Sequence, residues 1–451
     1  MEHSLKGYAD DVTLISCDID VHKSVLQTID LRAADLDLTF KPSKCISFLF
    51  DDTQVVQKGL PLSKGSTRPI TEGQTKYLGK LFDVSLSATK KAASKRLINR
   101  LTDLLTATNS LPIRGEYKLW IYRKYIISLL RFHLCVDAVS NGSISKSESI
   151  ATRFLKKWLN LPRSATRVIL YYPDVCCPSI SHVSREAKLS LLACVSSSSD
   201  LRLQELNLQL RLGSAALQIQ DTDYSILSSA KKQLSAFPSA RSLYVTAKKQ
   251  LREHTKMQCE DHLQSLSVQS KFQNSAELET SCRTWNRLVM GFHPGQLSFL
   301  LRAASDTLPT AVNLLRWSIQ SEAKCALCDS QRPTTAHVLS SCPAALNQSR
   351  YNYRHDQVLF ILTTKLTEFF AGIPHVQVFA DLPNFHANHC PQSTISSSLL
   401  ITSYRPDIVL YNSQSSSVAL LELTCPLDSN HHIESARARK QKKTRTSPAV
   451  G

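Results

Sequence analysis

Four potential metal ligands lie within eighteen residues of each other, and their spacing constrains the local fold more than any other feature of the chain. Cys325, Cys328, His337 and Cys342 form the pattern C-x2-C-x8-H-x4-C. Three thiolates and one imidazole suit tetrahedral Zn²⁺, and a C-x2-C pair supplies two thiolates from one tight turn. No strand–helix–strand pattern of the thioredoxin type surrounds the pair, which disfavours a redox role. We therefore predict a structural zinc site rather than scattered core cysteines.

The charge of the chain favours a polyanionic partner. Lys and Arg number 54 against 37 Asp and Glu, which gives a formal net charge of +17. Each Lys or Arg that neutralises a phosphate releases a counterion, so such an excess suits binding to RNA or DNA. The plainer alternative is a basic protein without such a partner. Hydrophobic residues make up 42% of the chain, which is enough for packed cores, and 451 residues correspond to about two to four domains.

Cysteine usage and hydropathy bear on the compartment. The thirteen cysteines are an odd number, and Cys135 and Cys194 sit in apolar runs, which predicts reduced, buried thiols rather than a disulfide framework. No apolar run reaches the roughly 18 residues of a membrane span, and no apolar segment follows Met1 as in a signal peptide. We expect a soluble intracellular protein of the nucleus or cytoplasm, without membrane contact.

Hydrophobic periodicity predicts mixed structure near both ends and helices between them. Leu97, Leu101, Leu104 and Leu105 share one face of a helical stretch at 88–135. Helical patterns also cover 22–37 and most of 150–320, with Ser-rich breaks at 195–199 and 225–240. Short β-type runs occupy 12–15, 46–50, 404–411 and 418–424.

Two adjacent carboxylates lie close to the N-terminus. Asp10 and Asp11 follow Gly7-Tyr8-Ala9 and precede the apolar run Val12-Thr13-Leu14-Ile15. Clustered carboxylates at a turn between strands can hold the two Mg²⁺ or Mn²⁺ ions of a nucleotidyl transferase. A solvated Asp-Asp turn is the simpler alternative for a motif this short.

The motifs that follow resemble a known enzyme family. Lys44 lies in Phe40-Lys41-Pro42-Ser43-Lys44-Cys45, and Tyr77-Leu78-Gly79 comes later. This order resembles motifs C, D and E of the reverse transcriptase palm in non-LTR retrotransposons. The resemblance implies that Asp10 and Asp11 are catalytic metal ligands, that Lys44 lies near the incoming triphosphate, and that Tyr77, Leu78 and Gly79 belong to the primer grip.

The resemblance also gives a role to the basic helix at 88–105. It would begin the thumb, which grips an RNA–DNA duplex through its phosphates. The basic residues proposed for this contact are Lys90, Lys91, Lys95 and Arg96. The family also needs fingers and a motif A carboxylate upstream of the Asp-Asp pair. Only seven residues precede Tyr8, so we expect an N-terminally truncated polymerase that does not polymerise by itself.

The C-terminal region carries a second pair of carboxylates. Asp407 and Glu422 lie on the two arms of a predicted hairpin, where they could share a divalent ion that activates water. The pair resembles the PD-(D/E)xK restriction-like endonuclease of early-branching non-LTR elements, and the surface charges of an ordinary hairpin are the alternative. Thr424 stands where the family's ExK lysine is usual, and the resemblance makes Lys440 its replacement. We expect weak, Mn²⁺-favoured DNA nicking at best.

Leu308-Pro309-Thr310 and Asn313-Leu314-Leu315-Arg316-Trp317 precede the cysteine cluster, and Arg350-Tyr351 and Arg354-His355-Asp356 follow it. This run resembles the region between polymerase and endonuclease in the same elements, and the resemblance implies that zinc shapes a basic nucleic-acid surface there. We therefore predict a multidomain α/β and α protein. Its expected parts are a partial reverse transcriptase palm (1–85), a helical thumb (86–175), a helical linker (176–320), a CCHC zinc knuckle (321–357), a restriction-like α/β endonuclease remnant (358–443) and an unstructured tail (444–451). The alternatives are a decayed or domesticated nucleic-acid-binding protein without enzymatic activity and a protein that is only a nuclease.

Overall fold

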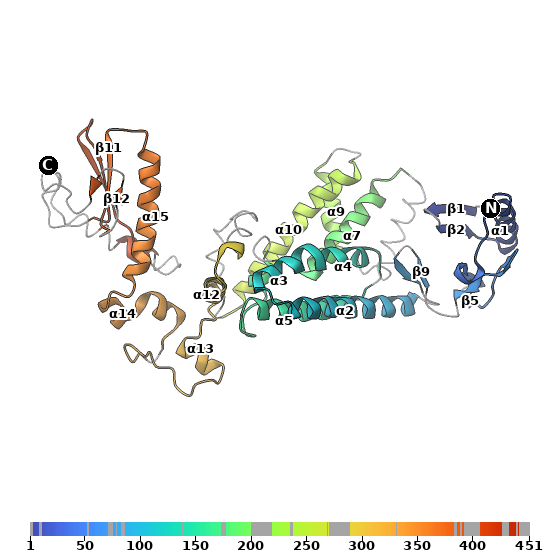
Figure 1. The fold of residues 1–451 in the computed structure, drawn as a ribbon, viewed down its shortest axis with the longest axis horizontal. Coiled ribbons are helices and arrows are strands. Elements are labelled where there is room, and N and C mark those ends of the chain that lie inside the picture. The colour runs from blue at the N-terminus through green and yellow to red at the C-terminus, as the bar shows by residue number, and fades with distance from the viewer. Residues whose placement is uncertain are drawn as a thin grey trace. The chain divides into compact units, whose positions relative to one another are not determined.

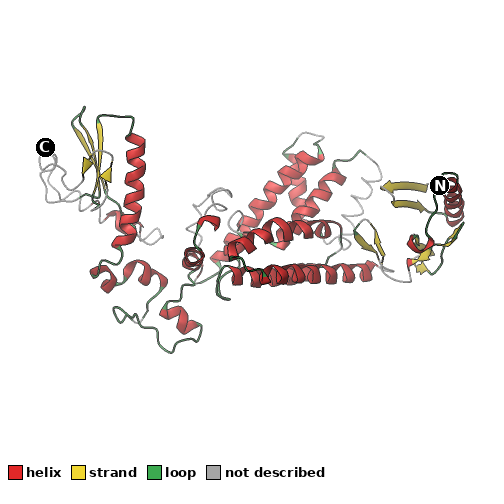
Figure 2. Ribbon diagram, viewed as in Figure 1, coloured by secondary structure: helices red, strands yellow, loops and turns green. Residues whose placement is uncertain are grey.

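Helices make up most of the secondary structure (Figure 2). The computed structural model describes residues 3–8, 11–51, 54–70, 75–77, 79–82, 86–137, 139–172, 177–199, 219–234, 238–267, 269, 289–330, 332–382, 386–387, 390–391, 406–425, 433–438 and 441. The chain divides into two units. The first holds residues 1–160, 170–259 and 285–294, and the second holds 161–169, 260–284 and 295–451.

An antiparallel hairpin begins the first unit. Strands β1 (His3–Tyr8) and β2 (Asp11–Ser16) pair so that Tyr8 lies opposite Asp11. Helix α1 (Ile19–Ala34) follows and packs on β2. The Asp18 carboxylate caps this helix by accepting the backbone N–H groups of its first turn. The helix predicted at 22–37 is therefore present, but it begins earlier because of this cap.

Short paired strands follow the hairpin. The parallel pair is β3 (Ile46–Ser47) with β8 (Arg68–Pro69), and η1 (Pro42–Lys44) precedes it. The antiparallel pairs are β4 (Leu49–Asp51) with β5 (Gln54–Val56), β6 (Pro61–Leu62) with β7 (Gly65–Ser66), and β9 (Thr75–Tyr77) with β10 (Lys80–Phe82). The predicted run 46–50 is divided between β3 and β4, because each half pairs with a different strand.

A body of helices forms the rest of the first unit. Its elements are α2 (Leu86–Ser110), α3 (Gly115–Ile121), the π-helical turn η3 (Tyr122–Ile126), α4 (Ile127–Val136), α5 (Asn141–Trp158), α6 (Val168–Tyr171), α7 (Ile180–Ser196), α9 (Asp221–Lys232) and α10 (Ala240–Gln264). Helices α2 and α5 lie side by side (Figure 1). The predicted leucine stripe is confirmed at Leu97, Leu101 and Leu105, which are buried, whereas Leu104 is half-buried. None of the described helices is long and apolar enough to cross a membrane.

The helical stretch expected at 88–135 is interrupted at 111–114. Pro112 lies in this break and cannot supply a backbone N–H to a helix. The chain resumes at Gly115, where a Cβ atom would lie 1.8 Å from the Trp158 carbonyl oxygen. Only glycine allows α3 to start this close to the end of α5.

Two expectations in the helical region were wrong. Helix α9 spans Asp221–Lys232, so it occupies half of the Ser-rich break expected at 225–240. Its Ile226, Leu227 and Ala230 pack in the core with α7 and α10, and this burial outweighs the weak helix propensity of serine. Cys194 is exposed although its neighbours in the sequence are buried, because it faces away from the core side of α7. The break expected at 195–199 does follow the end of α7.

A buried carboxylate connects three helices of this body. Glu186 of α7 accepts hydrogen bonds from Arg131 of α4 at 2.8 Å, and from Tyr244 and Lys248 of α10 at 2.7 and 2.8 Å. Burial alone would raise the pKa of the Glu186 carboxyl, but the three hydrogen bonds outweigh it and lower the pKa to about 2. The charged form of Glu186 therefore stabilises the packing of α4, α7 and α10.

The second unit ends in a small α/β layer. Its elements are α12 (Pro294–Ala304), α13 (Ala311–Arg316), the π-helical turn η5 (His337–Ser341), α14 (Pro343–Asn347), α15 (Asn352–Phe370), β11 (Val376–Ala380), β12 (His386–Ala387), β13 (Cys390–Pro391), β14 (Ile408–Asn412) and β15 (Ser417–Leu421). The antiparallel sheet has the order β11-β14-β15, and α15 covers it (Figure 1). Leu359, Val378, Ala380 and Ile408 form the core between them. The hairpin expected at 404–424 is confirmed for β14 and β15.

We predict that Glu186→Gln destabilises the first unit. The folded-state pKa of about 2 lies below the ordinary value of 4.5, so this contribution is complete above pH 4.5 and is lost as the pH falls toward 2. At neutral pH the variant should lose on the order of 2–3 kcal/mol in its free energy of unfolding. Urea denaturation across this pH range measures the effect. The exposed Glu253→Gln on α10 is the matched control, and an equal loss in both variants contradicts the prediction.

Candidate metal centre and neighbouring sites

The four predicted zinc ligands come together at the start of a short helical segment. Cys325 and Cys328 lie on a tight turn in which Cys325 N–H donates to Ser330 O at 2.9 Å and Asp329 N–H donates to Cys325 O at 3.0 Å. Asp329 adopts φ of 55°, as the end of such a turn requires. His337 begins η5, and Cys342 lies between η5 and α14. A tight turn therefore contributes two ligands, and the two ends of η5 contribute one ligand each.

Two separations between ligand atoms match the edges of a tetrahedral zinc site. Cys325 Sγ and Cys342 Sγ are 3.9 Å apart, and Cys328 Sγ and His337 Nε2 are 3.4 Å apart. All four ligand atoms lie within 4.8 Å of one another. Zn–S bonds of about 2.3 Å and Zn–N bonds of about 2.0 Å give tetrahedral edges of roughly 3.8 and 3.5 Å. The residues thus fit Zn²⁺ with four protein ligands, which leaves no position for substrate and suits a structural role.

The turn also prepares one thiol for metal binding. The backbone N–H of Leu327 donates to Cys325 Sγ at 3.5 Å. This hydrogen bond outweighs burial and lowers the pKa of the Cys325 thiol to about 6. A metal binds the thiolate, so a lowered pKa reduces the proton competition that zinc must overcome near neutral pH.

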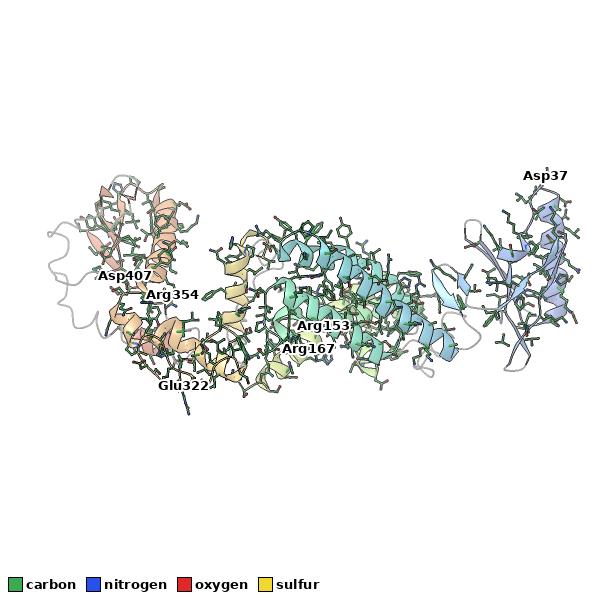
Figure 3. All side chains as sticks on the ribbon, turned by 60° about the horizontal axis from the view of Figure 1, so that its bottom comes forward. Asp37, Arg153, Arg167, Glu322, Arg354 and Asp407 are labelled. Carbon is green, nitrogen blue, oxygen red and sulfur yellow. The ribbon has the colours of Figure 1, made fainter. Side chains whose placement is uncertain are left out.

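Tyr351 and Arg354 connect residues 325–342, here called the metal loop, to α15 and to the sheet. The Tyr351 hydroxyl accepts the N–H of Cys342 at 3.4 Å and lies 3.0 Å from Val338 O. The Arg354 guanidinium lies over the Tyr351 ring, 5.6 Å from its centre. It donates to Leu339 O at 2.8 Å and, beyond β15, to Cys425 O at 2.9 Å. Figure 3 labels Arg354 and Asp407 in this part of the second unit. These roles were not predicted from the sequence, which shows only that both residues follow the cluster.

The predicted nuclease carboxylates lie at the end of the sheet beside α15. Asp407 is half-buried before β14, and Glu422 is half-buried after β15. Because Ile408 pairs with Leu421, these are neighbouring positions across the hairpin. Asp407 Oδ2 accepts Leu423 N–H at 2.7 Å, and Asp407 Oδ1 lies 3.4 Å from His355 Nε2. His355 was not predicted as part of this site, and Lys440 lies outside the described residues.

The N-terminal motif residues are only partly described. Asp11 is exposed at the start of β2, and Lys44 is exposed in η1, whereas Asp10 and Leu78 lie outside the described residues. Thr13 of β2 donates a hydrogen bond to the Tyr77 hydroxyl of β9. The structure thus brings the Asp-Asp hairpin and the predicted primer-grip strand together. The metal role of the carboxylates and the role of Lys44 stay predictions.

The turn after Tyr77 packs against the helical body. Gly79 has φ of 85°, and a Cβ atom there would lie 2.8 Å from the Phe132 ring of α4. Its carbonyl oxygen accepts a hydrogen bond from Arg96 Nη1 at 3.0 Å. Arg96 is thus half-buried beside this turn, while Lys91 and Lys95 of α2 are exposed. A nucleic-acid role for these basic residues stays a prediction.

Comparison with known families relates part of the second unit to a described family. The family model described as zinc-binding in reverse transcriptase matches residues 266–348, which include all four ligands of the cluster. A search of the curated proteins finds no match to this chain. The family match and the cluster geometry together confirm a zinc-binding domain of the reverse transcriptase type. The match begins well before the knuckle expected at 321–357 and includes α12 and α13.

We predict that the purified chain binds one Zn²⁺ through this cluster. The Cys325→Ser, Cys328→Ser double variant should lose the metal, because it removes both thiolates of the tight turn. The exposed Cys194→Ser should keep it. Metal analysis of the purified proteins measures the stoichiometry. Unchanged zinc content in the double variant contradicts the assignment.

We also predict that Arg354 supports zinc binding from outside the ligand shell. Arg354→Met removes the donors to Leu339 O and Cys425 O and should weaken zinc affinity by about tenfold, as is typical of supporting residues around a metal. Arg350→Met is the control, because Arg350 bonds only to Gln348 among the described side chains. Competition with a chromophoric chelator measures the affinities, and equal affinities for the two variants refute the role.

Proposed function

We propose that this chain is a reverse-transcriptase-related protein of the non-LTR retrotransposon type that binds RNA and DNA. The observation that carries the proposal is the match to the zinc-binding domain of reverse transcriptase around a cluster of three cysteines and one histidine. The upstream order of the Asp-Asp motif, Lys44 and Tyr77-Leu78-Gly79 and the net charge of +17 support it independently.

The contacts of the first unit support a palm-to-thumb arrangement within it. Tyr77 meets β2, and Gly79 meets α2 through Arg96 and α4 through Phe132. The turn that the resemblance assigns to the primer grip thus contacts both the Asp-Asp hairpin and the helices of the proposed thumb. In this proposal the lysines of α2 contact phosphates. Asp10 and Asp11 bind Mg²⁺ or Mn²⁺, which supplies the metal chemistry of an RNA-directed DNA polymerase, and Lys44 lies near the triphosphate.

A second activity is proposed for the C-terminal sheet. The hairpin register makes Asp407 and Glu422 neighbours, and His355 lies beside Asp407. Two carboxylates at one end of a sheet can hold a divalent ion that activates water for DNA cleavage. The alternative is a protein that keeps nucleic-acid binding and has lost both activities.

We predict that the chain binds nucleic acid with a steep salt dependence. Every lysine that contacts a phosphate contributes about 0.9 to the slope of log K against log salt. Lys91→Glu with Lys95→Glu should therefore weaken binding and flatten the slope by about 2. Fluorescence anisotropy with an RNA–DNA hybrid over a potassium chloride series measures both quantities.

The control for this experiment makes the same charge change elsewhere. Lys157→Glu with Lys249→Glu alters two exposed lysines on α5 and α10 and should change the slope less than the α2 pair does. If the wild-type affinity does not depend on salt, the proposed binding through phosphates is wrong. If both double variants lose affinity equally, α2 has no special role.

We predict at most weak, Mn²⁺-favoured nicking of plasmid DNA by the zinc-loaded chain. Asp407→Asn keeps the size of the side chain but weakens metal binding, so any nicking should disappear in this variant. Glu368→Gln, which removes an exposed carboxylate from the last turn of α15, is the control. Nicking that survives Asp407→Asn requires withdrawal of the nuclease assignment. If the chain binds nucleic acid but shows neither nicking nor primer extension, the result favours the alternative of a nucleic-acid-binding protein without enzymatic activity.

A further inference from the structure

A groove between α2 and α5 gathers positive charge from two parts of the sequence. Its volume is about 520 Å³. Lys90, Lys91 and Lys95 line it from α2, and Lys146 lines it from the second turn of α5. About fifty residues separate Lys146 from the others in the sequence, and the pairing of α2 with α5 brings them to one place (Figure 1). The sequence pattern alone did not predict Lys146.

No negative charge offsets these lysines inside the groove. None of the residues that line it is acidic. Within the described part of the chain, none of the four lysines has a carboxylate at ion-pair distance. Four ammonium groups around one hollow repel one another, so an anion that enters it gains attraction from each. Lys91, Lys95 and Lys146 are also exposed, so their ammonium groups reach solvent-borne ligands.

The remaining lining groups offer hydrogen-bond donors. Ser94 Oγ accepts the N–H of Ser140 at 3.2 Å, so the hydroxyl proton of Ser94 stays available to a ligand. Ser140 caps α5 by accepting Ser143 N–H, also at 3.2 Å. The groove therefore adjoins the first turn of an eighteen-residue helix. Nothing lies within 4 Å of a Cβ built on Gly142 in this turn, which leaves the helix end open.

We propose that this groove binds a sugar–phosphate segment of a nucleic acid, with one phosphate held among the four lysines. This proposal depends on the proposed function in one respect, namely that the phosphate belongs to a nucleic acid. Lysines act as point charges toward phosphate oxygens and need no fixed fork geometry, so four of them can surround one anion from different sides. The volume exceeds that of a single phosphate ion and leaves room for an adjoining sugar.

The test compares two lysines on the same helix. Lys146→Gln removes a charge from the groove, and Lys157→Gln removes an equal charge eleven residues, or about 16 Å, further along α5. We expect Lys146→Gln to weaken the binding of an RNA–DNA hybrid by about tenfold and to lower the salt slope by about 1. Lys157→Gln should stay within about twofold of wild type. Lys146→Arg should restore binding, because it restores the charge.

Each outcome decides one claim. If Lys146→Gln and Lys157→Gln lose equal affinity, or Lys146→Gln loses none, the groove is not a defined site, and the proposed function stands. If wild type binds no nucleic acid, the proposed function fails, and inorganic phosphate then tests the groove. Phosphate should raise the Tm of wild type above that in chloride of equal ionic strength, and should do so less for Lys146→Gln. Equal shifts in the two proteins overturn the site, and circular dichroism checks that the variants are folded.

Discussion

Closure of four ligands around one ion is the constraint on which the second unit depends most. The apolar cluster at this site holds few residues, namely Cys325, Cys342 and Ala345 with Cys328, Ala344 and Tyr351 around them. A segment this short buries too little apolar surface to offset its loss of conformational entropy. Metal binding supplies that free energy instead, because the ligands cannot hold this geometry in the unfolded chain. The positions of η5 and α14 follow from the ligands at their ends.

In the first unit, buried pairs of opposite charge stabilise the packing of the helices. Its helices bury several acidic groups against cations, as with Glu186 beside Arg131 and Lys248, and Asp223 beside Arg185 at 2.7 Å. An unpaired charge in the interior would cost free energy, and the neighbouring cation offsets this cost for the buried carboxylate. The lysines of the groove have no such partners among the described residues. The core therefore holds compensated charge, while the face between α2 and α5 carries the excess that a polyanion can neutralise.

Local patterns in the sequence predicted what depends on local geometry. The spacing of the four ligands, the leucine stripe of α2 and the hairpin of β14 and β15 each reflect a period or a turn within about twenty residues. Contacts between distant segments were not predictable in this way. Lys146 joins Lys91 and Lys95 only because α2 packs on α5. Arg96 directly follows Lys95 in the basic part of α2. Its side chain nevertheless turns away from solvent, because the Gly79 carbonyl oxygen lies within its reach.

The first turns of α15 connect the zinc loop to the carboxylates at the end of the sheet. Arg354 donates to Leu339 O beside the ligands, and the next residue, His355, lies 3.4 Å from Asp407. Consecutive helical residues are held about 100° apart around one axis, so a shift of this turn moves both contacts together. Asp407 also accepts Leu423 N–H through its other oxygen, Oδ2. The geometry around Asp407 therefore depends on the metal loop through the first turns of α15.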